Sequence, residues 1–285
     1  MKTSKILIVG SGGQLGRQMK AQHPEATAID SAKLNIADAN EVDAFNWQDY
    51  SVIINAAAYT RVDEAETDTG RIEAWSVNAT GVANLARVAI KHQLLLIHFS
   101  SDYVFDGREK SLTEATPFSP LGIYGQSKAA GDLSASLVNK HYILRTSWVI
   151  GDGNNFVRTM LGLAQKGINP TVVADQIGRP TFTNELVNAV DYLLDHDLPF
   201  GTYNLSNEGK AVSWADLART TFRLSGLNDA IVTDTTTEMY YAGKSNIAPR
   251  PRNSMLDLTK IEAAGYMPMD WEENLIQYLE KEQLL

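Results

Sequence analysis

A run of branched apolar residues that leads straight into a glycine-rich turn constrains this chain most. Residues 5–10 (KILIVG) have the composition of a parallel strand buried on both faces. Gly10, Gly13 and Gly16 follow at three-residue spacing, where a helix is expected to begin. In such a turn the first glycine permits the tight bend, the second lets backbone approach a pyrophosphate, and the third allows close packing of the helix. The pattern predicts a dinucleotide-binding turn, in which the helix start at Gln14 and Leu15 offers amides to phosphate.

Asp30 ends the next strand-like run and lies 20 residues after Gly10. At this place a carboxylate binds the adenosine ribose hydroxyls of a dinucleotide. A carboxylate would repel the extra phosphate of NADPH and so favour NADH, but Lys33 lies nearby. The choice between NADPH and NADH therefore stays open.

Alternating strands and helices predict the fold class, which is α/β. Strands are expected over residues 51–57, 94–100 and 142–150, with a helix over 73–91 between two of them. This order favours a Rossmann-type, doubly wound parallel sheet. Amphipathic helices over residues 213–225 and 270–282 flank a threonine- and proline-rich stretch, which predicts a smaller C-terminal α/β substrate lobe. We expect an NAD(P)-binding domain over residues 1–151, completed by parts of 183–207, and a lobe over 152–285.

Composition excludes several classes of partner. The net charge of −9, with no basic stripe, argues against nucleic acid. Without cysteine the chain has no disulfide and no thiolate ligand, and its 5 histidines show no ligand-like spacing, so we expect no metal. No apolar run reaches the roughly 18 residues of a membrane span. Residues 1–10 lack a small-residue cleavage site, and we expect a cytoplasmic monomer or homodimer without a membrane partner.

Tyr124 and Lys128 are the first candidates for catalysis. Four residues apart on a helix, a phenol and an ammonium project from one face. A phenol has a pKa near ~10, and we expect the cation to lower the pKa of Tyr124, so that it can protonate a carbonyl oxygen as hydride arrives at carbon. Ser101, at the end of the strand over 94–100, can hydrogen-bond the same oxygen. The alternatives are a chance pair on a helix and a serine that caps a strand.

Asn78 interrupts the apolar pattern of the helix predicted over residues 73–91. Its amide either binds a water or backbone near the site, or makes a local hydrogen bond that kinks the helix. We include it among the cofactor-site candidates.

Eight segments taken in order resemble the extended short-chain dehydrogenases, and within them the dTDP-4-dehydrorhamnose reductases. They cover nearly the whole chain: residues 10–16 (GSGGQLG), 55–66 (NAAAYTRVDEAE), 99–107 (FSSDYVFDG), 124–128 (YGQSK), 144–149 (LRTSWV), 151–157 (GDGNNFV), 175–181 (DQIGRPT) and 250–258 (RPRNSMLDL). The resemblance implies NAD(P)H-dependent reduction of the C4 keto group of dTDP-4-dehydro-L-rhamnose to dTDP-L-rhamnose. This reaction belongs to nucleotide-sugar and cell-surface polysaccharide synthesis.

The resemblance also implies roles for individual residues. Ser101, Tyr124 and Lys128 would form the catalytic triad, with serine where the family often has threonine. The implied cofactor contacts are Asn35, Ile36, Ala58, Tyr59, Thr60, Phe99 and Lys128. The implied substrate contacts are Ser101, Asp102, Tyr124, Trp148 and Asn155, with Arg179, Arg250 and Arg252 as candidates for the diphosphate because guanidinium groups match phosphate oxygens. Surface salt bridging is the alternative role for these arginines.

Two positions depart from the family pattern. Gln18 stands where magnesium-linked dimers of the family carry a carboxylate, so we expect no such dimer. Asn35 replaces an aspartate that is frequent near the adenine.

Two other functions share much of this pattern. A nucleotide-sugar dehydratase or epimerase would have the same glycine turn, Tyr124 and Lys128, but dehydratases of this group resemble one another in an Asp-Glu pair where this chain has Asp102-Tyr103. A cofactor-binding regulatory subunit without catalysis is the second alternative.

Overall fold

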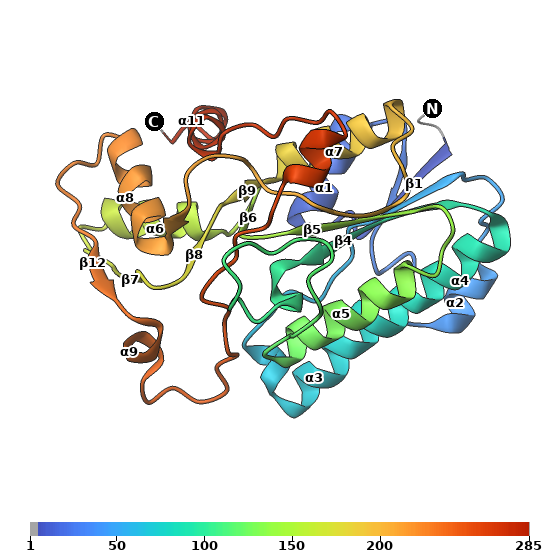
Figure 1. Ribbon diagram of the computed structural model, residues 1–285, viewed down its shortest axis with the longest axis horizontal. Helices are drawn as coiled ribbons and strands as arrows, with labels where there is room; N and C mark the ends of the chain where they lie inside the picture. Colours follow the sequence, from blue (N-terminus) through green and yellow to red (C-terminus); the bar gives the residue numbers. More distant parts are fainter. Residues whose placement is uncertain (1–4, 285) are drawn as a thin grey trace.

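A parallel sheet organises the larger of the two parts of the molecule, which a computed structural model describes over residues 5–284 (Figure 1). Its six strands lie in the order β10-β5-β4-β3-β1-β2, with all neighbours parallel. Their bounds are β1 (Ile6–Val9), β2 (Thr27–Ile29), β3 (Val52–Asn55), β4 (Leu95–Ser101), β5 (His141–Thr146) and β10 (Gly201–Asn204). The Rossmann-type sheet predicted from the sequence is confirmed.

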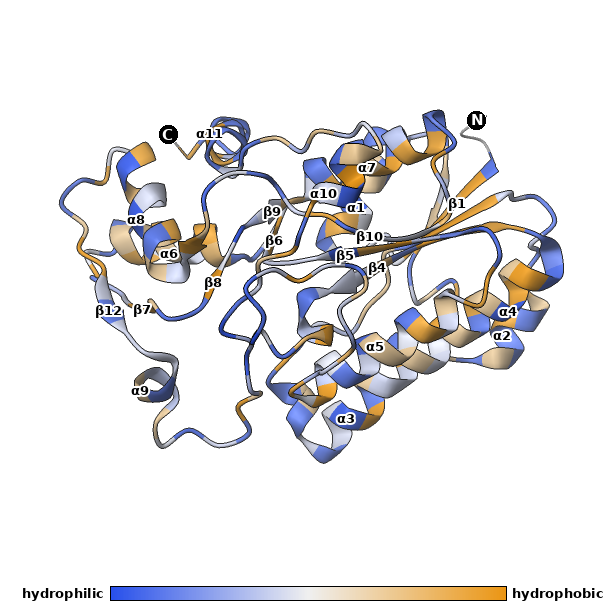
Figure 2. Ribbon diagram, viewed as in Figure 1, coloured by the Kyte–Doolittle hydropathy of each residue, from blue (hydrophilic) through white to orange (hydrophobic). Residues whose placement is uncertain are grey.

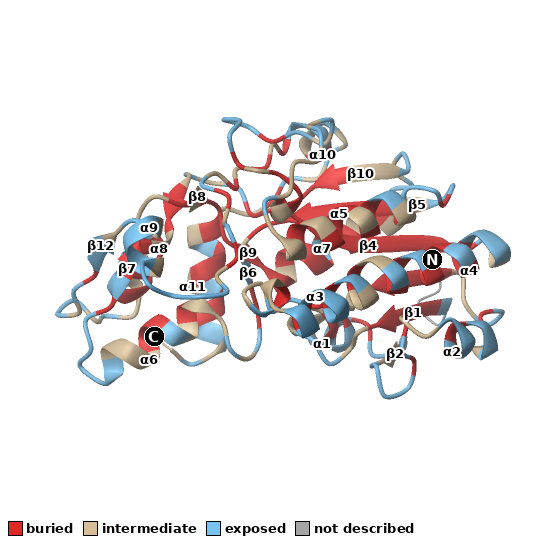
Figure 3. Cartoon of the chain, turned by 90° about the horizontal axis from the view of Figure 1, so that it is seen from below, coloured by how far each residue is buried: buried red, intermediate tan, exposed pale blue. Residues whose placement is uncertain are grey.

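Helices cover both faces of this sheet. On one face lie α1 (Gln14–Gln22), α7 (Thr183–Asp195) and α10 (Thr259–Ala263), which bury Met19, Leu186 and Ile261 against the strands. The other face is covered by α2 (Ala39–Ala44), α4 (Val82–His92) and α5 (Ile123–Ala135), with α3 (Asp68–Trp75) beside α5. Apolar residues dominate β1 and β4 (Figure 2), and the sheet is buried between helices whose outer faces are exposed (Figure 3). The apolar runs in the sequence, such as KILIVG, predict a sheet of this kind, with apolar strands and with helices on both faces.

The smaller part is built from four helices and short strand pairs. The helices are α6 (Phe156–Gln165), α8 (Trp214–Leu224), α9 (Thr237–Tyr241) and α11 (Trp271–Lys281). The strand pairs are β6 (Val149–Ile150) with β9 (Thr181–Phe182), β7 (Thr171–Val173) with β12 (Thr233–Thr235), and β8 (Ile177–Gly178) with β11 (Val212–Ser213). The chain leaves this part to form α7 and β10, returns for α8, and supplies α10 to the larger part before it ends in α11.

Two elements differ from the sequence prediction. The single helix expected over residues 73–91 is α3 followed by a π-helical turn, η3 (Ser76–Gly81), and α4. The strand expected over 142–150 is divided into β5 and β6, because Trp148 adopts a φ of +48° that no strand accommodates. Both interruptions lie beside the candidate site. None of the helices within residues 5–284 has the length and apolar character needed to cross a membrane.

Candidate active site

Three cavities run along the carboxyl edge of the sheet and into the groove between the two parts. The Asp30 cavity, of about 310 Å³, is lined by Gly10, Asp30, Asn35, Ile36 and Val77, among others. The Tyr124 cavity, of about 470 Å³, shares Gly13, Ala56 and Ala58 with it. The Arg250 cavity, of about 330 Å³, follows on the far side of Tyr103 and Trp214. Ligands of open α/β sheets bind at this edge, where the strand order reverses between β1 and β3.

The glycine turn has the backbone geometry of a phosphate cradle. Gly10 has a φ of +83°, and a Cβ there would collide with Ala57 after the neighbouring strand. The sequence pattern predicts that Gly16 allows the helix to pack closely on the sheet. In the structure a Cβ on Gly16 would instead collide with the Gly10 carbonyl, so this glycine is needed for the turn to close on itself. Gly13 faces the shared part of the two cavities, and the first hydrogen bond of α1 runs from Arg17 N to Gly13 O. The amides of Gln14 and Leu15 therefore precede the helical ladder and suit a diphosphate.

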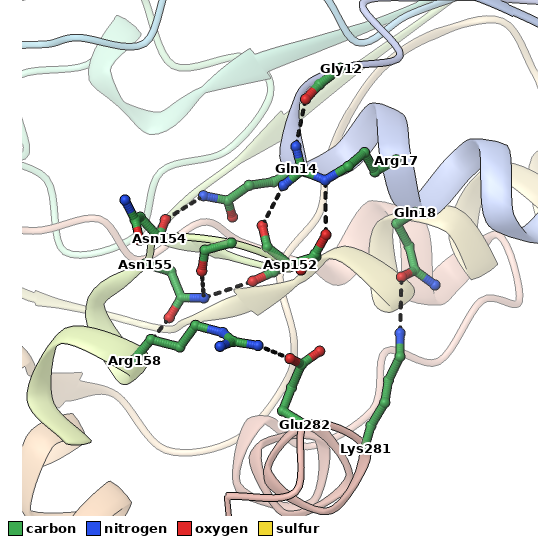
Figure 4. Close-up of polar contacts among 12 residues, drawn as sticks. Gly12, Gln14, Arg17, Gln18, Asp152, Asn154, Asn155, Arg158, Lys281 and Glu282 are labelled. Atoms are coloured by element: carbon green, nitrogen blue, oxygen red, sulfur yellow. Dashed lines mark hydrogen bonds and ion pairs between the residues drawn. The ribbon is translucent and has the colours of Figure 1, made fainter. Parts of the chain in front are cut away.

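Polar contacts tie the glycine turn to the smaller part of the molecule (Figure 4). Arg17 donates to Gly12 O at 2.5 Å, to Asp152 O at 2.7 Å and to the Asp152 carboxylate at 2.9 Å. Gln14 Nε2 donates to Asn154 O at 2.8 Å. The loop over residues 151–155 is thereby held beside the start of α1.

The Asp30 cavity has the chemistry of an adenosine site. Asp30 follows β2 directly, and its Oδ1 accepts a hydrogen bond from Ala32 N at 3.1 Å, which orients the carboxylate at the mouth of the cavity. Ile36 supplies a buried apolar wall and Asn35 an exposed amide. The residues present therefore fit the adenosine half of a dinucleotide.

The structure brings Ser101, Tyr124 and Lys128 together in the Tyr124 cavity, where Asp102 and Trp148 also line the wall. Ser101 ends β4, while Tyr124 and Lys128 lie one turn apart on α5. The Lys128 side chain is buried, and its Nζ donates to Phe99 O at 2.6 Å. Phe99 and the glycine-turn residues Gly13, Gln14 and Leu15 complete this wall.

Burial dominates the ionisation of this cluster. It raises the pKa of Tyr124 to about 12, against the lowering expected from Lys128, and a hydrogen bond with Ser101 opposes the rise. It lowers the pKa of Lys128 to about 8 because an ammonium loses hydration there, with Asp132 acting in the opposite direction. Burial likewise raises the pKa of Asp102 to about 6. The phenol is thus held in its protonated, proton-donating form.

Asn78 and Tyr59 lie outside the three cavities and hold two of the segments that line them. The Asn78 amide accepts from Tyr59 N at 2.9 Å, and donates to Tyr59 O at 3.1 Å and to Ser127 Oγ at 3.0 Å. The π-helical turn η3 thus fixes the loop after β3 and the helix of Tyr124 through one side chain. Tyr59 itself is buried outside the three cavities, whereas its neighbours Ala58 and Thr60 line the Tyr124 cavity.

The remaining substrate candidates lie in different surroundings. Arg250 lines the Arg250 cavity and pairs with Asp63 at 2.8 Å. Arg179 is buried away from the cavities and donates to Leu256 O at 2.6 Å. Arg252 is exposed and lies 3.6 Å from Asp175. Asn155 caps α6 and donates to Gly151 O at 2.7 Å, so its side chain shapes the loop over 151–155.

Several residues at the cavities carry no sequence signal of their own. Ser254 hydrogen-bonds to the Asp102 side chain and helps to hold down the pKa of that carboxyl. Thr146 and Trp214 line the Tyr124 cavity. Tyr240 and Tyr241 line the Arg250 cavity from α9. Only the capping pattern of Ser213 with Asp216 could have placed Trp214 at a helix start.

Gln18, where related dimers are expected to carry a carboxylate, lies in a polar surrounding. Gln18 Oε1 accepts a hydrogen bond from Lys281 at 3.3 Å (Figure 4). In the part of the chain that the structure describes, no three His, Cys, Asp or Glu residues are grouped as a metal would require.

Comparisons with known proteins agree with this geometry. A family model described as RmlD substrate binding domain matches residues 4–284. The chain is 40% identical to a dTDP-4-dehydrorhamnose reductase of Aggregatibacter actinomycetemcomitans, over 95% of this chain and 97% of that protein. It is 39% identical to the spore coat polysaccharide biosynthesis protein SpsK of Bacillus subtilis, over 98% of each.

A solved structure is similar over the same length. The dTDP-4-dehydrorhamnose reductase of Bacillus anthracis, in complex with NADP, has a TM-score of 0.88 and 33% identity, with 97% of each chain covered. The resemblance inferred from the eight sequence segments is confirmed. This chain belongs to the RmlD substrate binding domain family, the family of the dTDP-4-dehydrorhamnose reductases.

Proposed function

We propose that this protein reduces the C4 keto group of dTDP-4-dehydro-L-rhamnose to dTDP-L-rhamnose with NADPH or NADH. One observation carries the proposal. A protonated phenol, a serine hydroxyl and a buried lysine converge in a cavity that continues past the glycine turn to Asp30. In the same family, named relatives carry this activity and one was solved with NADP.

The cofactor would lie along the two connected cavities. We assign the adenosine half to Asp30, Asn35 and Ile36, and the diphosphate to Gly13 and the amides of Gln14 and Leu15. Ala58, Thr60 and Phe99 then line the nicotinamide end. Bound NAD(P)H supplies the hydride.

The side chains of the Tyr124 cavity would handle the proton and orient the keto group. As the new C–H bond forms at C4 of the sugar, the C=O π bond breaks and its electron pair moves to oxygen. That oxygen takes the hydroxyl proton of Tyr124, while Ser101 donates a hydrogen bond to it. Lys128, still an ammonium below pH of about 8, stabilises the phenolate that remains. Asp102 and Trp148, which line the same cavity, would contact the sugar ring.

The sugar nucleotide would extend from the Tyr124 cavity into the Arg250 cavity. Aromatic and apolar side chains line the latter, including Tyr241, Phe156 and Met160, as a nucleoside base requires. Arg250 adds a positive charge beside it.

Loss of the nicotinamide absorbance on addition of dTDP-4-dehydro-L-rhamnose, with dTDP-L-rhamnose identified by NMR, tests the proposal. Tyr124→Phe is the matched control, because it removes one hydroxyl and leaves the glycine turn intact. Turnover should collapse in this variant while cofactor binding persists. Release of water from dTDP-glucose would indicate a dehydratase instead, and cofactor binding without turnover would indicate a regulatory subunit.

A further inference from the structure

Trp214 stands at the wall between the Tyr124 cavity and the Arg250 cavity, and it lines both. It is the first residue of α8, and Ser213 before it is held in two ways. The Ser213 hydroxyl accepts from Asp216 N at 3.0 Å in a capping box, and Ser213 also pairs with Ile177 in the β8–β11 ladder. The backbone of Trp214 is therefore fixed before its side chain makes any contact.

The Trp214 indole stacks on the indole of Trp148. The ring centroids lie 3.8 Å apart and the planes are 16° from parallel. Trp148 has a φ of +48°, an unfavourable conformation for a bulky residue that persists only where the surroundings enforce it. Gly178 is part of those surroundings, since a Cβ there would lie 2.9 Å from the Trp148 ring. Trp214 and Gly178 together thus leave the Trp148 ring one position in the Tyr124 cavity.

A chain of hydrogen bonds leads from Trp214 to the wall of the Arg250 cavity. Trp214 Nε1 donates to Gln176 Oε1 at 3.2 Å, and Gln176 Nε2 donates to Thr237 Oγ1 at 3.0 Å. Thr237 Oγ1 in turn donates to Asp175 at 2.6 Å. Thr237 begins α9, whose Tyr240 and Tyr241 line the Arg250 cavity. One residue therefore supports a wall of each cavity.

We propose that Trp214 is a positioning residue that determines which face of the sugar's C4 is presented for reduction. The inference rests on the proposed function. A pyranose ring in the Tyr124 cavity has two faces, and reduction at one or the other gives opposite configurations at C4. The stacked Trp148 ring blocks one of the two orientations as long as Trp214 holds it. A small side chain at position 214 frees Trp148 from its left-handed backbone conformation and admits the inverted sugar.

Trp214→Ala should therefore yield a mixture of the two C4 epimers, distinguished by NMR of the product, where the parent yields one. We expect kcat to fall about 10- to 100-fold, since a misplacement of about 1 Å costs this much, while the dissociation constant of NADPH stays unchanged. Trp214→Phe retains an aromatic ring for stacking and loses the N–H to Gln176. It should keep a single epimer and change mainly the KM for the sugar nucleotide, through α9.

Two further variants keep the test decisive if Trp214→Ala folds poorly. Gly178→Ala leaves Trp214 in place and introduces a Cβ that would lie 2.9 Å from the Trp148 ring and 3.1 Å from Ser254 Cβ, and it should also release the second epimer. Trp271→Phe is the matched structural control, because Trp271 is a buried indole of the same part of the molecule, outside the Tyr124 cavity, whose Nε1 donates to Lys210 O at 2.9 Å. It should lower the melting temperature and leave a single epimer.

The outcomes separate this inference from the proposed function. A parent protein that reduces no 4-keto nucleotide sugar overturns the proposed function, and with it this inference. An active parent whose Trp214→Ala and Gly178→Ala variants both give one epimer overturns the inference alone.

Discussion

Burial raises the pKa of Tyr124 and lowers the pKa of Lys128, two side chains of one site. It stabilises the neutral form of each group, which keeps the phenol protonated and makes the ammonium easier to lose. The pair therefore works below the pH at which Lys128 gives up its proton. The consequence is a pH limit that an exposed lysine, with a pKa near ~10, would not impose.

We predict that kcat/KM falls as pH rises through about 8, the pKa to which burial lowers Lys128. Above that pH the lysine is neutral and no longer stabilises the phenolate of Tyr124. Lys128→Arg keeps a charged side chain, so its kcat/KM should no longer fall as pH rises through about 8, although its maximal rate should be much lower. A pH profile of kcat/KM measures both. A parent profile that stays flat to pH of about 10 would contradict the assignment.

Asp102→Asn should stabilise the ligand-free protein at neutral pH while impairing turnover. The Asp102 pKa is raised from 3.8 to about 6, which corresponds to about 3 kcal/mol against the ionised native form. Its hydrogen bond from Ser101 Oγ contributes about 1 kcal/mol, so we expect a net gain of about 1–2 kcal/mol.

The sign of the pH dependence identifies the cause. The native parent binds the Asp102 proton more tightly than the unfolded chain does, so its stability falls as pH rises from about 4 to about 6 and is constant above. The advantage of Asp102→Asn in denaturant unfolding should grow over this range and then level off. A difference independent of pH would show that Asp102 ionisation is not responsible.

The site residues that could be predicted from the sequence are those that work together with residues a few positions away in the chain. Tyr124 and Lys128 are related by one helical turn, and Gly10, Gly13 and Gly16 by one βα turn. Trp214 and Ser254 reach the site through contacts that join distant segments. The pKa of Tyr124 also depends on its burial, which spacing does not show.

At the scale of elements, β1, β3 and β4 were predicted closely because buried parallel strands read as continuous apolar runs, whereas the strand expected over 142–150 proved to be β5 and β6. The π-helical turn η3 was not, since Asn78 satisfies the backbone of Tyr59 across the fold. The sequence shows a polar residue in an apolar helix, but not that its partner is the backbone of Tyr59.

Arg17 joins two elements that must be ordered for cofactor binding, the glycine turn and the loop over residues 151–155. We predict that Arg17→Ala weakens NADPH binding about 3- to 10-fold, because the turn is then ordered only when the cofactor binds. The melting temperature should change little, since the ion pair is about half exposed. Arg87→Ala breaks a similarly exposed pair with Asp43, remote from the turn, and is the control. Equal cofactor dissociation constants for the two variants would contradict a role for Arg17.

At the scale of the whole molecule, the chain returns twice to the larger part after first leaving it, so neither part is a continuous segment. The expected boundary near residue 151 lies where the regular alternation of apolar strands and helices gives way to a polar turn. Parts of residues 183–207 are expected from the sequence to complete the larger domain, and α7 and β10 lie in that range. The return of α10 was not expected, because it depends on apolar contacts that a short helix such as Thr259–Ala263 does not reveal by periodicity.

Arg250 bridges the two parts at the Arg250 cavity, through Asp63 of the larger part, and its guanidinium lies over the Tyr241 ring at 4.6 Å. We predict that Arg250→Ala raises the KM for the sugar nucleotide by an amount equivalent to roughly 1.5–3 kcal/mol, the contribution of a charged hydrogen bond to a diphosphate, with cofactor affinity unchanged.

Two controls distinguish a diphosphate contact from a purely structural bridge. Arg252→Ala removes an exposed guanidinium of the same segment and should leave KM unchanged. Asp63→Asn weakens the bridge but leaves Arg250 free to bind phosphate, so it should not reproduce the loss of affinity. If Asp63→Asn raises KM as much as Arg250→Ala does, Arg250 acts by joining the two parts. If neither variant changes KM, the diphosphate is bound by other residues, and the placement of the nucleotide in the Arg250 cavity is wrong.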